Sequence, residues 1–135
     1  AALFGAMIGY EREAAGKAAG FRTHILVTLG ATLFVLAGSQ NGMDSAGLSR
    51  VIQGIITGIG FIGAGSILKG TDQQFVKGLT TSSGIWMAAA IGVTVGLGSV
   101  GLAFVASVIT LVVLRAFIPV DDMLDSSDGD RDKDA

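Results

Sequence analysis

The sequence predicts an all-α, polytopic membrane protein with about five transmembrane helices, and two observations carry that prediction. Half of the 135 residues are hydrophobic and only 15% are charged, whereas soluble domains carry about 25% charged residues. The charges are also confined to residues 11–24, 44–50, 69–77 and 115–134, with apolar runs between them. Such runs fit membrane spans of roughly 20 residues. A soluble bundle is the alternative, but it would need charged outer faces on its helices.

The apolar segments define the predicted helices in chain order. Residues 1–10 are too short to span, and we expect them to be the end of a truncated first helix. Residues 24–38 form a short second segment, which we expect either to extend to Phe21 or to tilt little in the membrane. The segments 51–68, 79–98 and 100–118 are long enough to cross a bilayer, and Pro119 stops the last of them. Together these segments predict one membrane domain over residues 1–119.

Residues 120–135 predict a disordered, acidic, cytoplasmic tail. Low hydrophobicity and high charge favour disorder there. Asp128, Asp130 and Asp132 alternate as in a calcium loop, but Lys133 stands where such a loop needs glycine. The chain has no cysteine and a single histidine, which excludes thiolate and multi-histidine metal sites. The sequence therefore predicts no cofactor and no metal site.

Lysine and arginine predict the orientation of the chain. With five spans, one side of the membrane holds eight of these residues and the other side holds Arg50 alone. Cytoplasmic loops carry the excess of positive charge, so the 11–24 loop and the C-terminal end are expected to face the cytoplasm. The eight residues are Arg12, Lys17, Arg22, Lys69, Lys77, Arg115, Arg131 and Lys133.

Glycines crowd the third apolar segment. Gly58, Gly60 and Gly63 have the spacing of a phosphate-binding loop, but they lie within an apolar run, where that loop would need a preceding strand and water. Small residues instead let membrane helices approach closely. Gly54, Gly58 and Gly65 share one side of the helix and Gly60 and Gly63 the other, which predicts packing between two neighbours. A discontinuous helix that lines an ion cavity is the alternative.

Two polar clusters are candidates for function. In the first, Glu11 and Glu13 end one helix, and Arg22 and His24 begin the next. The connection is short, so we expect Glu11 or Glu13 to pair with Arg22, either as a structural ion pair or as a buried pair that marks an ion or partner site.

The second cluster opens the fourth segment with Thr80, Thr81, Ser82 and Ser83. These hydroxyls either cap the helix and bond neighbouring backbone groups, or they line a polar vestibule. Trp86 would anchor or pack nearby.

Several blocks together resemble the membrane domain of the MgtC/SapB family. They are GYERE, AGFRTHILVTLGA, SRVIQGIITGIGFIGAGSIL and KGLTTSSGIWMAAAIGVTVGLG, in family order over residues 1–115. The resemblance implies a multi-pass protein of the bacterial inner membrane that supports growth in low magnesium and, in pathogens, survival inside macrophages. It implies modulation of the ATP synthase membrane sector as the mode of action. The expected partners of this chain are the lipid bilayer and either that membrane sector or a second copy of the chain, with no nucleic acid.

The resemblance also transfers a set of candidate residues to this chain. The expected role is not enzymatic, and the alternative is an ion transporter or channel for Mg²⁺ or another cation. Gly47 and Leu48 before Ser49 and Arg50, and Ser82 and Ser83 after Thr81, depart from the commonest family pattern. The functional candidates are Glu11, Arg12, Glu13, Arg22, Thr23, His24, Arg50, Thr80, Thr81 and Trp86, together with the packing glycines Gly54, Gly58, Gly60, Gly63 and Gly65.

Overall fold

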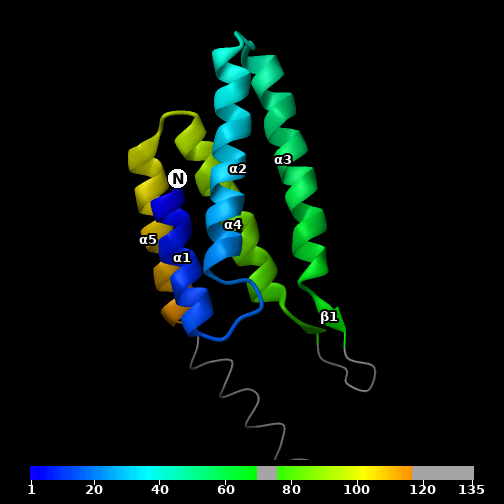
Figure 1. The fold of residues 1–135 in the computed structure, drawn as a ribbon, viewed down its shortest axis with the longest axis vertical. Helices are drawn as coiled ribbons and strands as arrows, with labels where there is room; N and C mark the ends of the chain where they lie inside the picture. Colours follow the sequence, from blue (N-terminus) through cyan, green and yellow to red (C-terminus); the bar gives the residue numbers. More distant parts are fainter. Residues whose placement is uncertain (70–75, 117–135) are drawn as a thin grey trace, which may run out of the picture.

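The computed structural model describes residues 1–69 and 76–116, and this part of the chain is helical apart from one small hairpin (Figure 1). β1 (Leu68–Lys69) pairs antiparallel with β2 (Val76–Lys77). The expected tail at 120–135 lies outside the described residues. The helices are α1 (Ala2–Ala14), α2 (Phe21–Gln40), α3 (Ser45–Gly65), α4 (Leu79–Gly96) and α5 (Val100–Ala116).

Three of the helices are long and apolar enough to cross a membrane, namely α2, α3 and α4. The bounds 24–38 of the second segment are too short, because α2 has 20 residues; it begins at Phe21, the residue expected to extend the segment. The Glu13 side chain accepts a hydrogen bond from the Phe21 backbone N–H at 2.8 Å. That carboxylate satisfies one of the unpaired donors at the start of the helix, a contact that hydropathy does not report. α5, with 17 residues, is an apolar helix slightly shorter than the other three.

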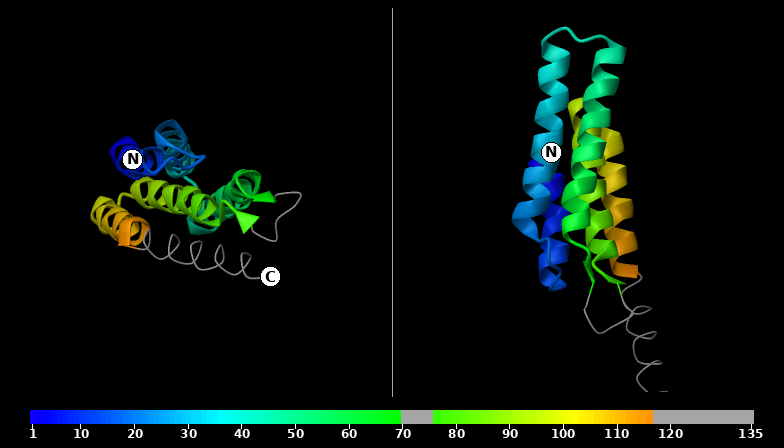
Figure 2. Two further views of the ribbon diagram at one scale, coloured as in Figure 1. Left: turned by 90° about the horizontal axis from the view of Figure 1, so that it is seen from below. Right: turned by 90° about the vertical axis from the view of Figure 1, so that its right-hand side faces the viewer.

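The helices form two layers with α4 in a central position. α5, α4 and α3 lie in a row, and α1 and α2 lie against one side of that row (Figure 2). The most extensive contacts join α2 to α4 and α1 to α2. α1, α3 and α5 end, and α2 and α4 begin, at the same end of the bundle (Figure 1). We call this the basic end; the α2–α3 turn lies at the opposite end.

The apolar core has two parts, and α4 contributes to both. On one side of α4, Ile91 joins residues of α1 and α5; on the other, Ile85 and Ala89 join residues of α2 and α3. Leu102, Val108 and Val112 on the outer side of α5 are exposed, as expected of a helix side that faces lipid. The two groups are Phe4, Ile8, Ile91, Ala103 and Leu114, and Ala19, Ala31, Ile59, Ile85 and Ala89.

Glycines bring α2 close to both of its neighbours. A methyl group on Gly5 of α1 would lie 2.7 Å from the carbonyl oxygen of His24, and one on Gly96 of α4 would lie 2.7 Å from the Val35 Cβ. Real Cβ atoms essentially never approach so closely. α2 is therefore held between glycine surfaces on α1 and α4, which is how small residues let membrane helices pack.

The glycines of α3 do not pack between two neighbouring helices as the sequence predicts. Among the five glycines predicted to pack, a methyl group on Gly54, Gly58, Gly60 or Gly65 would meet no neighbouring atom of the described residues within 4 Å. Gly63 alone of the five has a close neighbour there, the Ser82 Oγ at 2.6 Å. The predicted packing between two neighbours is thus wrong within this chain. α3 lies at the end of the row of helices (Figure 2), so only the side that contains Gly63 faces another helix.

Candidate functional site

A buried ion pair lies at the basic end of the bundle. Glu11 and Arg12 are 5% and 1% exposed, in the last turn of α1. The Arg12 Nε donates to one Glu11 carboxylate oxygen at 2.5 Å, and Nη2 donates to the other at 2.7 Å. This two-bond geometry is the strong form of a carboxylate–guanidinium contact. The pair removes the net charge that either side chain alone would place inside the bundle.

Arg12 also connects α1 to α5. Its Nη2 lies 3.5 Å from the carbonyl oxygen of Leu114, in the last turn of α5. The last four carbonyls of a helix have no partner within the helix, and a cation is favourable at that end. The Arg12 guanidinium therefore links the last turn of α1 to the last turn of α5 at the basic end.

His24 is fully buried in the first turn of α2. Its Nδ1 lies 2.9 Å from the carbonyl oxygen of Gly20. A carbonyl can only accept, so Nδ1 carries the proton and Nε2 of the neutral ring is an acceptor. Nε2 has no partner among the described residues, and a methyl group on Gly84 would lie 3.4 Å from it. The ring therefore presents an unused acceptor to α4.

The predicted pairing with Arg22 is wrong. Glu11 bonds to Arg12 instead, and Glu13 bonds to the Phe21 backbone. Arg22 is exposed. The exposed Arg22 guanidinium can stay in water, whereas the buried Arg12 guanidinium needs a counter-ion. Glu11 therefore pairs with Arg12 rather than with Arg22.

A ladder of threonines continues from His24 into the bundle, and sequence reasoning missed it. The Thr28 hydroxyl donates to the His24 carbonyl at 2.6 Å, and the Thr32 hydroxyl lies 2.9 Å from the Thr28 carbonyl and 2.7 Å from that of Gly92 on α4. The three polar residues recur every four positions, which puts them on one side of a helix. That spacing within an apolar segment was the signal that could have found them.

The other candidate residues do not join this cluster. Thr23 is half-buried, and Thr81 is buried on the side of α4 that packs against α2. Thr80 and Trp86 are exposed. Arg50 is exposed in α3, toward the opposite end. Within residues 1–69 and 76–116, no group of three or more His, Cys, Asp or Glu side chains is placed to hold a metal ion.

The model of the MgtC family matches residues 1–123. The chain belongs to the MgtC family. It is similar to YhiD of Escherichia coli (strain K12), whose name provisionally assigns it as a magnesium transporter, with 43% identity over 87% of this chain and 57% of YhiD. Protein SrpB of Synechococcus elongatus is 41% identical over 87% of this chain and 70% of SrpB.

Protein MgtC of Salmonella typhimurium (strain LT2) is 42% identical over 82% of this chain and 46% of its own length. The chain thus spans about half the length of YhiD and MgtC. No solved structure matches this chain. Family membership and the apolar helices together describe a membrane protein of the MgtC family.

Proposed function

We propose that this chain is the membrane part of a bacterial inner-membrane protein that supports adaptation to low magnesium or acid stress. It acts by binding and modulating a membrane partner, and it performs no enzymatic step of its own. The partner that the family resemblance implies is the membrane sector of the ATP synthase. In this proposal the basic end and the C-terminus face the cytoplasm, because most lysines and arginines lie there.

One surface of α4 carries this proposal. Leu79 is 57% exposed and Trp86 is 47% exposed, and Ser83 between them is exposed too. At 100° per residue these three lie within about 60° of one another. They point away from Thr81 and Ala88, which are buried on the side toward α2.

The chemistry of this surface suits a protein partner. Tryptophan combines large apolar area with one hydrogen-bond donor and is enriched at interfaces. Hydroxyl groups next to it form interhelical hydrogen bonds within membranes. α4 also contacts all four other helices of the bundle, so a partner bound here would act directly on the central helix.

The test compares two exposed aromatic residues. We expect Trp86→Ala to abolish growth support in a low-magnesium medium, in a strain that lacks its own family member. Phe104→Ala is the matched control, because Phe104 is 54% exposed on α5 and should be replaceable. A photo-crosslinking residue at position 86 should capture an ATP synthase membrane subunit. Equal growth of the two variants would refute the proposed surface, and capture of a different protein would replace the named partner.

The buried cluster at the basic end favours a second candidate, a cation transporter or channel. Glu11, Arg12 and the open acceptor of His24 are the kind of intramembrane polar groups that mark ion paths. Proteoliposomes that contain the purified chain and a magnesium-sensitive dye separate the two candidates. Partner modulation predicts no flux above that of empty vesicles; flux that His24→Ala removes would establish transport.

A further inference from the structure

The outward side of α3 differs in chemistry from the other exposed helix sides. We use this name for the exposed residues Arg50, Gln53, Gly54, Thr57, Gly58, Phe61, Ala64 and Gly65. Seven of the eight are polar or small, and the eighth, Phe61, is 84% exposed. Ile56 and Ile62, at 46% and 48% exposed, flank this side of the helix. The outer side of α5 instead presents Leu102, Val108 and Val112. Lipid favours the composition of α5, whereas small and polar residues are typical of helix–helix contacts in membranes.

We propose that the outward side of α3 is the contact surface between two copies of this chain. This proposal is independent of the proposed function, because it uses α3 rather than the surface of α4. It rests on three properties that suit a second copy related by a two-fold axis: complementary charges, complementary shape, and a side-chain amide that can pair with itself.

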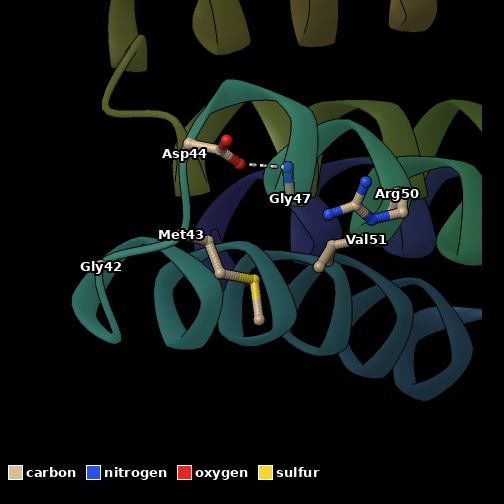
Figure 3. Close-up of a pocket in the computed structure, with 6 residues that line it drawn as sticks. All are labelled: Gly42, Met43, Asp44, Gly47, Arg50 and Val51. Atoms are coloured by element: carbon tan, nitrogen blue, oxygen red, sulfur yellow. Dashed lines mark hydrogen bonds between the residues drawn. The ribbon is translucent and has the colours of Figure 1, made fainter.

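The charges lie at the start of α3. Asp44 and Arg50 line an open pocket with Met43, Gly47 and Val51 (Figure 3). One Asp44 oxygen accepts from the Gly47 backbone N–H at 2.7 Å. The Arg50 guanidinium is turned back toward Gly47 (Figure 3), as helical side chains incline toward the N-terminus.

Among the described residues, Asp44 and Arg50 make no ion pair with one another or with any other side chain. A two-fold contact places the same patch on both copies, so residue i of one copy meets residue j of the other and the reverse. Each Arg50 can then pair with the Asp44 of the second copy. One acid and one base on the same patch thus make the charges of this surface self-complementary.

The shape is self-complementary as well. Gly58 and Gly65 lie three residues before and four residues after Phe61, so both are its neighbours on the helix surface. Apart from the backbone of α3 itself, no atom of the described residues lies within 4 Å of where a Cβ of either glycine would stand. Phe61 of each copy can therefore pack onto the glycines of the other.

Gln53 supplies the third property. It is exposed eight residues into α3, about 12 Å along the helix axis at 1.5 Å per residue. A side-chain amide has both a donor and an acceptor, so two Gln53 side chains across a two-fold axis can satisfy each other. Facing lipid, each amide would lack hydrogen-bond partners.

Disulfide crosslinking tests this contact, and the chain suits the method because it has no native cysteine. Thr57→Cys introduces one thiol on the outward side of α3, and Ile109→Cys introduces one on the exposed side of α5. We expect oxidant added to native membranes to convert Thr57→Cys to a covalent dimer at least about ten times faster than Ile109→Cys. Equal rates, or adducts of Thr57→Cys with another protein only, would overturn the proposal.

A second variant separates self-association from folding. Gly58→Leu adds a side chain at a position where the described part of the chain places no neighbouring atom within 4 Å, so the detergent-extracted yield of folded protein should stay unchanged. The Thr57→Cys dimer should fall at least about five-fold in the same variant. Leu102→Ala on α5 is the control and should leave dimer formation intact. Undiminished crosslinking in Gly58→Leu would also overturn the proposal.

Discussion

Arg12 determines the electrostatics of the basic end. Its guanidinium is 1% exposed and bonds to both oxygens of Glu11. Burying a charge is costly unless it is paired, and removing one partner leaves the other unpaired inside the bundle. Glu11 and Arg12 should thus depend on each other far more than either depends on Arg22.

We expect Arg12→Ala to lower the free energy of unfolding by about 3–5 kcal/mol, because it leaves the Glu11 carboxylate buried and unpaired. Arg22→Ala should cost less than about 1 kcal/mol, as for other exposed charges. Thermal unfolding of the detergent-purified variants measures both. The double change Glu11→Leu with Arg12→Met should be less damaging than Arg12→Ala, because it removes both charges together. A double change as damaging as Arg12→Ala would show that charge burial is not the cause.

α2 packs between α1 and α4, and glycines on both neighbours make this close packing possible. On one side Gly5 approaches the His24 carbonyl and the Ile25 Cα, and on the other side Gly92 approaches Thr28 and Ala31. The Thr32 hydroxyl bonds to the Gly92 carbonyl across the same contact. Backbone proximity between α2 and α4 thus allows an interhelical hydrogen bond as well as packing.

The same substitution in two helices tests this arrangement. Gly92→Ala should destabilise the protein by about 1–3 kcal/mol, because the added methyl group overpacks the α2–α4 contact. Gly101→Ala in α5 meets nothing within 4 Å and should be neutral or stabilising by up to about 1 kcal/mol, because alanine favours helix over glycine. Thermal unfolding in one detergent compares them. Equal effects would contradict close packing at Gly92.

The molecule as a whole has most of its lysines and arginines near one end, and the α2–α3 turn lies at the other (Figure 1). α2, α3 and α4 alternate in direction across the bundle and are each long enough to cross a membrane. This asymmetry of charge favours the basic end in the cytoplasm.

Labelling of intact cells tests the orientation. A membrane-impermeant thiol reagent should modify Ser45→Cys, next to the α2–α3 turn, and should not modify Lys17→Cys, in the α1–α2 connection. Both positions are exposed, so accessibility within the protein does not separate them. Permeabilised cells provide the control, in which both variants should react. The reverse pattern in intact cells would invert the proposed topology.

The sequence by itself determined the fold class, the family and the positions of most helices. Hydropathy and charge act over segments of about 20 residues, and they depend on the solvent rather than on particular neighbours. For that reason the segments 79–98 and 100–118 match α4 and the described part of α5 closely. The segment 51–68 locates α3 less exactly, because that helix runs from Ser45 to Gly65. The residues around Glu11 and His24 were also recognised as a polar cluster, because charges and histidine are rare within apolar segments.

Only the tertiary structure decided which partner each of these residues has. In the sequence Glu11 is next to Arg12 and is separated from Arg22 by a short connection, so either arginine could be its partner. In the structure Glu11 and Arg12 are both buried and pair with each other. The glycines of α3 have the periodicity of a packed helix, yet Gly58 faces away from the chain, whereas Gly92 faces α2. Periodicity tells which residues share a side of a helix. It does not tell which side meets a neighbour, since that depends on where the helix lies in the bundle.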